Sequence, residues 1–257
     1  MATNPTLDLL MNRASVRAYT DRVPDDETVS TIVRAGQQAP FAHQCCSVIL
    51  QREGPFTWGA PLRLLVCADA HRIGLVAARR GWERRTNDLQ LLLFAVQDAA
   101  YLAQNMVIAA ESLGLGSCYI GSPVVTAAAL RERCALPPKV LPLVGLVLGH
   151  PAERPAPRPR YPLAFTLFEE RYPELDEDAV TGAMRVMDEG FLAESYYRRL
   201  NAMVPLPEGR EETFTFDDYS WTEHISRKLQ WNPDPADLLA GLRACGFDVT
   251  GGGEDGE

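Results

Sequence analysis

A run of about 26 residues, from Asp88 to Leu113, carries apolar side chains at spacings of three and four. This spacing predicts one helix, which at 1.5 Å per residue is about 39 Å long, as long as a whole domain. Apolar residues also lie off the main stripe, at Leu91, Phe94 and Leu102, so we expect the helix to be buried nearly all round. It is either the central helix of a core or, in part, a surface packed against a second subunit.

Segments typical of strands and helices alternate on both sides of this long helix. Short apolar runs rich in β-branched residues predict four strands, at residues 47–51, 62–68, 117–121 and 140–148. Helical spacing and capping residues predict further helices at 5–11, from Pro24 onward, at 124–136, 175–200 with a break near Gly190, 223–229 and 235–244. Alternation of this kind indicates a layered α+β or α/β domain.

Two short arginine-bearing stretches stand almost 150 residues apart, Arg13-Ala14-Ser15-Val16-Arg17 and Arg158-Pro159-Arg160. In an extended backbone alternate side chains point to one side, so the basic and hydroxyl groups of each stretch share a face. The arginine fork suits phosphate, and serine adds a hydroxyl donor. If the two stretches meet, they form a pocket for one phosphate group; either stretch alone is equally well read as a solvated surface turn.

The composition limits the class of ligand. The chain has 257 residues, 46% hydrophobic and 23% charged, with a net charge of −9, so we expect no nucleic-acid partner. A phosphate pocket in an acidic protein indicates a small phosphorylated ligand. The first residues lead straight into an amphipathic segment, and the apolar run from Leu91 to Val96 is closed by Gln97 and Asp98. We therefore expect neither a signal peptide nor a membrane span.

Cysteine and histidine usage predicts a reducing compartment. The six cysteines include no Cys-x-x-Cys pair, and the four histidines lack metal-ligand spacing. We therefore expect a cytoplasmic protein without disulfides or a metal. Five arginines gather at Arg72, Arg79, Arg80, Arg84 and Arg85. They are either a solvated loop or partners for an adenosine 2′-phosphate.

Several motifs in one order resemble the nitroreductase superfamily of FMN-dependent oxidoreductases, most of all the NADPH-dependent, oxygen-insensitive nitroreductase and flavin reductase branch. The resemblance covers residues 8 to about 175 well and the last 80 loosely. The motifs that carry it are Arg13-x-Ser15-x-Arg17 with Tyr19-Thr20-Asp21, Gln44-Cys45-Cys46-Ser47, Ala103-Gln104-Asn105, Ala110-Glu111-Ser112-Leu113-Gly114-Leu115-Gly116, Tyr119-Ile120-Gly121, Leu141-Pro142-Leu143-Val144-Gly145-Leu146-Val147-Leu148-Gly149 and Arg158-Pro159-Arg160.

The resemblance implies an α+β, three-layer fold with a central mixed or antiparallel sheet flanked by helices, a long buried central helix and an intertwined homodimer. One domain would cover residues 1–250, with 151–250 as a proline-rich and helical C-terminal excursion and 251–257 as a disordered acidic tail. It also implies FMN at the subunit interface. The residues expected to bind it are Arg13, Ala14, Ser15, Val16, Arg17, Gln44, Tyr119, Ile120, Gly121, Ser122, Arg158 and Arg160.

Two of these assignments have a structural alternative. Backbone N–H groups at the Tyr119–Ser122 turn can stabilise the charge that a reduced flavin gains at its N1–C2 oxygen edge, and Gly121 permits close approach. The same residues also fit a plain strand-to-helix turn, with Ser122 as N-cap and Pro123 at the first helical position. Gln44 is either an amide near the ring or a structural residue.

The implied activity is ping-pong hydride transfer from NADPH or NADH, through FMN, to a nitroaromatic, quinone or flavin acceptor. It requires no catalytic acid or base of the chain, and we name none. The alternatives are an FMN-dependent oxidase or dehydrogenase acting on a biosynthetic intermediate with oxygen as acceptor, a non-catalytic flavin-binding protein, and a thiol enzyme using Cys45 or Cys46.

The chain also departs from the family pattern. Arg13-Ala14 replaces a common His-Arg pair, and Ala39-Pro40-Phe41-Ala42-His43 replaces a serine-rich loop before the glutamine. The segment between Gln51 and Trp58 is short and lacks a glutamine that normally touches the flavin. An arginine expected in the donor-binding C-terminal region falls near Asp234. These departures leave the choice between NADPH, NADH and another reductant open.

Overall fold

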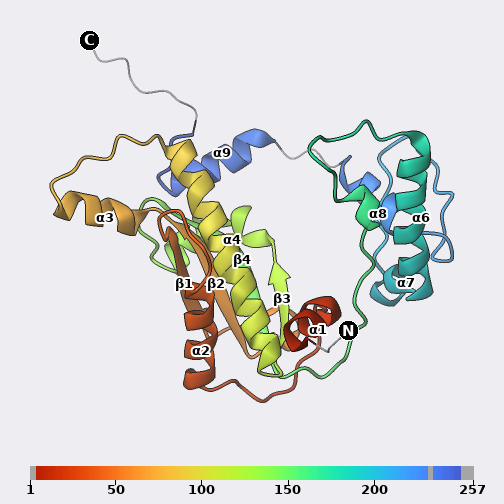
Figure 1. Ribbon diagram of the computed structural model, residues 1–257, viewed down its shortest axis with the longest axis horizontal. Helices are drawn as coiled ribbons and strands as arrows, with labels where there is room; N and C mark the ends of the chain where they lie inside the picture. The colour runs from red at the N-terminus through yellow and green to blue at the C-terminus, as the bar shows by residue number, and fades with distance from the viewer. Residues whose placement is uncertain (1–3, 231–233, 250–257) are drawn as a thin grey trace, which may run out of the picture. The chain divides into compact units, whose positions relative to one another are not determined.

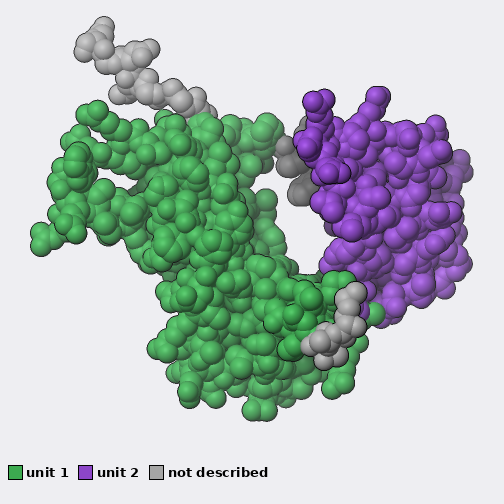
Figure 2. All heavy atoms as spheres, viewed as in Figure 1, with its two compact units in different colours: residues 1–156, 234–257 green, residues 157–233 purple. Residues whose placement is uncertain are grey.

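The structure is a computed structural model that describes residues 4–230 and 234–249. The chain divides into two compact units, residues 1–156 with 234–257, and residues 157–233 (Figures 1 and 2). The second unit is therefore inserted into the first along the sequence. The predicted acidic tail, 251–257, lies outside the described residues.

A four-stranded sheet forms the centre of the first unit. All neighbouring strands are antiparallel, and their order is β1-β2-β4-β3. The strands are β1 (Cys46–Gln51), β2 (Leu62–Asp69), β3 (Gly116–Ile120) and β4 (Val140–Gly149). All four predicted strands are confirmed, with bounds that shift by one residue at most. The central strands β2 and β4 are buried on both faces, as their continuous apolar runs predict.

Helices cover both faces of this sheet, so the predicted three-layer α+β fold is confirmed. On one face lie α4 (Asp88–Ser112) and α2 (Asp26–Gln37), in front of the sheet in Figure 1. Both pack on Leu64 and Leu146. On the other face, α5 (Ala127–Arg133) and the residues after it pack on alternate strand residues such as Leu65. The remaining elements of the unit are α1 (Pro5–Asn12), α3 (His71–Arg79), α9 (Pro235–Ala244) and the 3₁₀ turns η1 (Thr57–Gly59) and η2 (Ser122–Val124).

The long helix α4 is the core element that the sequence predicts, but it is not buried all round. Met106 and Val107 are fully buried, whereas Leu89, Leu93 and Tyr101 are 49%, 55% and 45% exposed. These three, with the exposed Gln97 between them, follow one stripe on the helix. By length and hydropathy alone α4 could cross a membrane, but half of its apolar window is buried inside the protein, as in the core helix of a soluble domain.

Three helix predictions need correction. The sequence did not predict helix α3, because none of its residues is buried and its sequence therefore lacks the apolar spacing of a core helix. The predicted helix 124–136 is the turn η2 followed by the shorter α5. The predicted break near Gly190 is confirmed but lies four residues later, at Glu194–Ser195, because Gly190 itself is inside a helix and the ring of Pro159 occupies the place of its missing side chain.

The second unit has its own small aromatic core. Its elements are η3 (Leu163–Phe165), α6 (Glu177–Ala193), α7 (Tyr196–Leu200) and α8 (Trp221–Lys228). The predicted helix 175–200 is interrupted at Glu194–Ser195, where Ser195 has a φ of +45°, and continues as α7. Phe191, Tyr197 and Tyr219 are buried together. Thr222, at the start of α8, donates its backbone N–H to the carboxylate of Asp188 at 2.9 Å.

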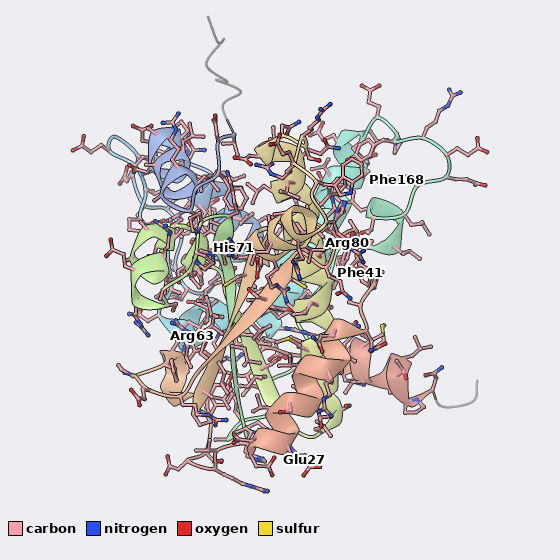
Figure 3. The ribbon with its side chains drawn as sticks, turned by 90° about the vertical axis from the view of Figure 1, so that its left-hand side faces the viewer. Glu27, Phe41, Arg63, His71, Arg80 and Phe168 are labelled. Carbon is pink, nitrogen blue, oxygen red and sulfur yellow. The ribbon has the colours of Figure 1, made fainter. Side chains whose placement is uncertain are left out.

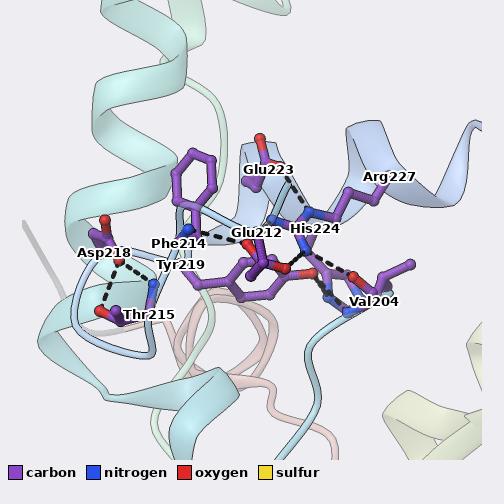
Figure 4. A network of polar contacts seen from close by, with 9 residues as sticks. All are labelled: Val204, Glu212, Phe214, Thr215, Asp218, Tyr219, Glu223, His224 and Arg227. Carbon is purple, nitrogen blue, oxygen red and sulfur yellow. Dashed lines mark hydrogen bonds and ion pairs between the residues drawn. The ribbon is translucent and has the colours of Figure 1, made fainter. Parts of the chain in front are cut away.

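The Arg227 side chain connects residues 204–212 of this unit to α8 through hydrogen bonds and an ion pair (Figure 4). Its side chain is 3% exposed, and its guanidinium binds Glu212 through two hydrogen bonds of 2.6 and 2.8 Å and Glu223 through one of 2.7 Å. It also donates to the carbonyl of Val204 at 2.9 Å and lies 4.9 Å from the ring centre of Tyr219. The Arg227 guanidinium lowers the pKa of the Glu212 carboxyl to about 2.

Candidate functional site

The Arg13–Arg17 segment runs along the free edge of strand β3. The backbone N–H of Val16 donates to the carbonyl of Ser117 at 2.9 Å, and the Val16 side chain is buried. The phenol of Tyr19 donates to the Val16 carbonyl at 2.7 Å. Anchored at Val16, the segment is extended as predicted, with Arg13, Ser15 and Arg17 at alternate positions.

Each arginine of this segment has a neighbour that the sequence did not identify. The Nε of Arg13 lies 3.9 Å from the carboxylate of Glu111, which also accepts a hydrogen bond of 3.2 Å from the hydroxyl of Ser117. Burial raises the pKa of the Glu111 carboxyl, and Arg13 opposes that rise. The Arg17 guanidinium lies 5.2 Å above the ring of Trp58, and its backbone N–H donates to Glu153. Both arginines are thus held at the β3 edge by their surroundings.

The Tyr119–Ser122 turn directly continues strand β3, so it lies beside the Arg13–Arg17 segment. Tyr119 donates from its phenol to Gln104 on α4 at 3.4 Å, and Ile120 packs with Phe56. Gly121 has an ordinary φ of −81°, and a Cβ added there would meet no heavy atom of the described chain within 4 Å. The space in front of Gly121 is therefore open to a ligand. Gly121, rather than Ser122, occupies the N-cap position of the turn η2.

Gln44 lies in a second region, at the start of β1. The loop before it is held by Asp98, a carboxylate on α4 that is 2% exposed. Asp98 accepts hydrogen bonds from the backbone N–H groups of Ala42, His43 and Cys45 at 2.7, 3.1 and 2.9 Å. Gln44 itself adopts a left-handed φ of +52°, which costs free energy for a residue with a side chain.

A cavity of about 280 Å³ opens beside this loop. Phe41 (labelled in Figure 3), Gln44, Arg72 and Asp98 are among the residues that line it. The Phe41 side chain is 56% exposed. Arg72, in the first turn of α3, donates from Nη2 to the carbonyl of Gln44 at 3.2 Å and to that of Cys46. The volume is near the lower limit for a small-molecule pocket.

The two regions lie at diagonally opposite corners of the sheet. The register places Cys46 beside Ala68 at one end of β2, and Ser117 in the row of Leu62 at the other end. Three strand spacings and six residues of strand separate them, about 25 Å in all. Since helices cover both faces between the corners, no single ligand can lie across the sheet from Gln44 to Arg13 of the same chain.

Arg158 and Arg160 belong to the second unit. The Arg158 guanidinium lies 4.5 Å above the ring of Tyr196 and donates to its hydroxyl. Arg160 is exposed and donates from Nη1 to the carbonyls of Arg158 and Pro159 at 3.0 and 2.9 Å. The pocket predicted from both arginine stretches stays a prediction.

Comparison with known proteins adds the evolutionary context. The sequence model of the nitroreductase family matches residues 48–150. An oxygen-insensitive NADPH nitroreductase of Salmonella typhimurium is 33% identical over 241 residues, which cover 88% of this chain and 91% of the relative. This chain belongs to the nitroreductase family. An FMN reductase (NADPH) of Bacillus subtilis is 29% identical over 247 residues, covering 90% of this chain and 93% of its own length.

The fold of this nitroreductase-family protein has close counterparts among solved structures. NfrA2 of B. megaterium superposes with a TM-score of 0.81 at 27% identity and covers 96% of this chain and 99% of its own. The match therefore includes the second unit, where the sequence resemblance was loose. It confirms the fold class that the motifs implied.

The donor set at the β3 edge fits the phosphate of FMN. Arg13 and Arg17 offer charged forks, and the Ser15 hydroxyl forms no hydrogen bond with any other residue of ranges 4–230 and 234–249. Of the neighbours that sequence reasoning missed, Asp98 had a readable signal, because it is a carboxylate in the middle of an apolar helix. Glu111 had none, since its role depends on long-range packing.

The thiol-enzyme alternative has little support from the geometry. Burial raises the pKa of Cys45 to about 11 and also raises the pKa of Cys46, so both thiols stay protonated at neutral pH. The Cys45 sulfur faces the backbone carbonyl of His43 at 4.0 Å, while the His43 ring packs against Phe94. In the part of the chain that is described, no three His, Cys, Asp or Glu side chains group around a possible metal site.

Proposed function

We propose that this protein is an FMN-dependent NAD(P)H oxidoreductase that reduces a nitroaromatic, quinone or free-flavin acceptor. The single observation that carries the proposal is the anchoring of Arg13, Ser15 and Arg17 beside the open turn at Gly121, within a nitroreductase fold. The names of its relatives, an FMN reductase (NADPH) and an oxygen-insensitive NADPH nitroreductase, support the same activity.

Each element of the site has one task in this proposal. Arg13, Ser15 and Arg17 hold the FMN phosphate, with Ala14 and Val16 setting the spacing, and Arg158 and Arg160 are further candidates for it. Tyr119, Ile120, Gly121 and Ser122 form the backbone turn against the ring, where N–H groups favour negative charge. Bound FMN supplies the hydride chemistry, and the protein orients the donor and then the acceptor at the same place.

The partner in this site is a second copy of the chain. Gln44 and Arg13 of one chain are too far apart, across a covered sheet, to contact one flavin. A flavin that contacts both kinds of residue takes Gln44 from the other subunit. The exposed apolar stripe of Leu89, Leu93 and Tyr101 on α4 supplies a surface for such a homodimer.

A cytoplasmic location agrees with the chemistry of the thiols. All six cysteines are described, and none forms a disulfide. Proteins of the reducing cytosol have this property.

An anaerobic titration tests the activity. The purified protein with FMN is mixed with NADPH and, separately, NADH, and the flavin absorption is followed; a nitroaromatic, a quinone or free FMN is then added. Bleaching by a nicotinamide donor and recovery with an acceptor is the expected result. A flavin that stays oxidised with both donors, yet is reduced by an organic substrate and reoxidised by oxygen, would establish the oxidase alternative instead.

The dimer is tested through Leu89→Glu combined with Leu93→Glu. Two carboxylates in an apolar interface are expected to shift the sedimentation coefficient toward a monomer and to weaken FMN binding in parallel. Loss of the dimer with full FMN affinity would rule out a shared site.

A further inference from the structure

His224, in helix α8, is bound to Tyr219 within the aromatic core of the second unit (Figure 4). Its Nδ1 lies 3.0 Å from the Tyr219 hydroxyl. The imidazole also stacks on the ring of Tyr197 in α7, with the ring centres 4.3 Å apart. This one side chain therefore joins α7, α8 and the segment between them, residues 201–220.

The direction of the hydrogen bond between His224 and Tyr219 follows from counting protons. The Tyr219 hydroxyl accepts a hydrogen bond of 2.9 Å from the backbone N–H of Val204. Within the described chain, its own proton has one acceptor, Nδ1 of His224. Tyr219 is 1% exposed, so bulk water does not take that proton. Nδ1 therefore carries no proton, and the imidazole is neutral in the folded unit.

A second proton on the imidazole would leave a buried donor without a partner. With a proton on Nδ1, the Tyr219 oxygen can accept hydrogen bonds from both Nδ1 and Val204. The O–H of Tyr219 then has no acceptor, which is unfavourable for a group that is shielded from water. The neutral ring fits this network and the charged ring does not.

The groups around the ring also disfavour a charged imidazole. Burial lowers the pKa of His224, and the positive charges of Lys228 and Arg227 on α8 lower it further, while a hydrogen bond to the carbonyl of Ala202 opposes the shift. On α7, burial raises the pKa of the Tyr197 phenol, so the stacked ring is neutral at physiological pH. A proton on the imidazole would therefore add a positive charge close to two others.

The carboxylates of this region already have partners. Glu212 binds Arg227 through two hydrogen bonds, and Glu223 binds it through a third. On α6, Asp188 accepts hydrogen bonds from the backbone N–H and the hydroxyl of Thr222 at 2.9 and 2.5 Å. These acidic groups stabilise the closed arrangement of α6, α8 and residues 201–220 rather than a charged imidazole.

We infer that His224 is a pH-sensitive switch of the second unit: uptake of a proton by its imidazole opens the junction of α7, α8 and residues 201–220. Acid favours the open junction, because the ring binds a proton more readily there than in the closed one. The stabilisation is complete above about pH 6.5, the ordinary histidine value. It is lost as the pH falls from there to the lower pKa of the folded unit.

The junction is in contact with an arginine of the candidate site. Tyr196, which precedes Tyr197 in α7, lies with its ring 4.5 Å from the Arg158 guanidinium and accepts a hydrogen bond from it. The rings of Tyr196 and Tyr197 meet edge to face at 5.1 Å. Opening the junction therefore changes the surroundings of Arg158, a candidate for the FMN phosphate. Only this consequence rests on the proposed function; the switch itself does not.

Hydrogen exchange followed by mass spectrometry tests the switch in the full-length protein with FMN. Peptides covering residues 196–224 are compared at about pH 7.5 and about pH 5.5, after correction for the intrinsic pH dependence of exchange. Peptides of β2 serve as an internal reference. We expect the protection of residues 196–224 to fall about tenfold at the lower pH, and that of β2 to stay constant.

His224→Gln removes the titrating ring but keeps a side-chain oxygen that can accept from Tyr219. Residues 196–224 of this variant should be equally protected at both pH values. His150→Gln is the matched control, because His150 lies in the first unit and burial lowers its pKa as well. This control should keep the wild-type response to pH.

A second measurement does not depend on the folding of His224→Gln. All four histidines are replaced by 2-fluorohistidine, which keeps the shape of the ring but stays neutral at both pH values. The response of residues 196–224 to pH should then disappear. The inference is overturned if these residues respond no more than β2 in wild type. It is also overturned if His224→Gln or the fluorinated protein responds like wild type, or if His150→Gln abolishes the response.

Discussion

The carboxylate of Asp98, in the middle of helix α4, accepts a hydrogen bond of 2.9 Å from the backbone N–H of Cys45. Two more N–H groups, of Ala42 and His43, converge on the same carboxylate. A buried side chain of the core thus fixes the backbone of a loop that carries Gln44 at a left-handed φ. The loop is held by the fold rather than by its own sequence.

Replacing Asp98 with asparagine should loosen this loop. The amide keeps the size of the side chain but offers one acceptor oxygen instead of two, so at least one buried N–H loses its partner. We expect a loss of about 1–3 kcal/mol in stability and faster hydrogen exchange at residues 42, 43 and 45. Exchange at these amides as slow as in wild type would contradict this role of Asp98.

Replacing Gly116 with alanine should displace the phosphate-binding segment. A Cβ at this position would lie 2.8 Å from the Cβ of Val16, too close for both to stay in place. The Val16–Ser117 hydrogen bond would be lost, at about 1 kcal/mol, and FMN affinity should fall about tenfold, as measured by fluorescence titration.

Gly182→Ala is the matched control for Gly116→Ala. Gly182 lies inside α6, and its Cβ would meet no heavy atom within 4 Å. It should keep wild-type FMN affinity and gain about 0.5–1 kcal/mol of stability. Equal FMN affinity in both alanine variants would show that the Val16 contact does not position the arginines.

The stability of the first unit should depend on the ionisation of Asp88. Burial raises the pKa of its carboxyl, but hydrogen bonds from Lys139 at 2.5 Å and from the backbone N–H of Asp248 at 2.7 Å outweigh that effect and lower the pKa. A lowered pKa means that this stabilisation is present above about pH 4, the ordinary aspartate value, and is lost as the pH falls through the pKa of the folded state.

Asp88→Asn should therefore cost about 1–3 kcal/mol at pH 7, measured by urea unfolding. The difference in the free energy of unfolding between variant and wild type should become smaller as the pH falls below about 4, where wild type loses the same charge. A gap that stays constant from pH 7 to pH 3 would mean that the carboxylate charge contributes nothing.

Replacing Arg227 with methionine should destabilise the second unit. The change removes a buried guanidinium that joins Glu212, Glu223 and Val204 (Figure 4). We expect a loss of about 2 kcal/mol and faster hydrogen exchange across residues 204–229. Arg227→Lys keeps the charge but cannot make the bidentate contact, so its stability should lie between those of wild type and the methionine variant. Unchanged exchange in the methionine variant would refute this account.

Local sequence patterns predicted the strands and helices that are stabilised by the burial of their apolar side chains. The strands and α4 were readable because β2, β4 and most of α4 bury continuous apolar surfaces. Helix α3 was not readable, because none of its residues is fully buried and its apolar spacing is therefore weak. Gly190 suggested a break in a helix, yet Pro159, 31 positions away, fills its place and the helix continues to Ala193.

The candidate site was predictable as a set of residues but not as an arrangement. Alternation in Arg13–Arg17 indicated one donor face, and the structure gives that segment a fixed edge to lie on. That Gln44 lies at the opposite corner follows from the strand order β1-β2-β4-β3, which no local pattern encodes. Arg72 likewise contacts Gln44 only because α3 follows the end of β2, and that end pairs with the start of β1.

Because residues 157–233 are inserted into the sequence of the first unit, the second unit can be completed before the first during synthesis. The core around α4 includes Cys245 and Phe247, which follow the whole second unit along the chain. On the ribosome, the second unit is therefore complete while the first still lacks part of its core. Part of the apolar surface of helix α4 stays uncovered until the last segment has been synthesised. During that interval the nascent chain is most prone to aggregation.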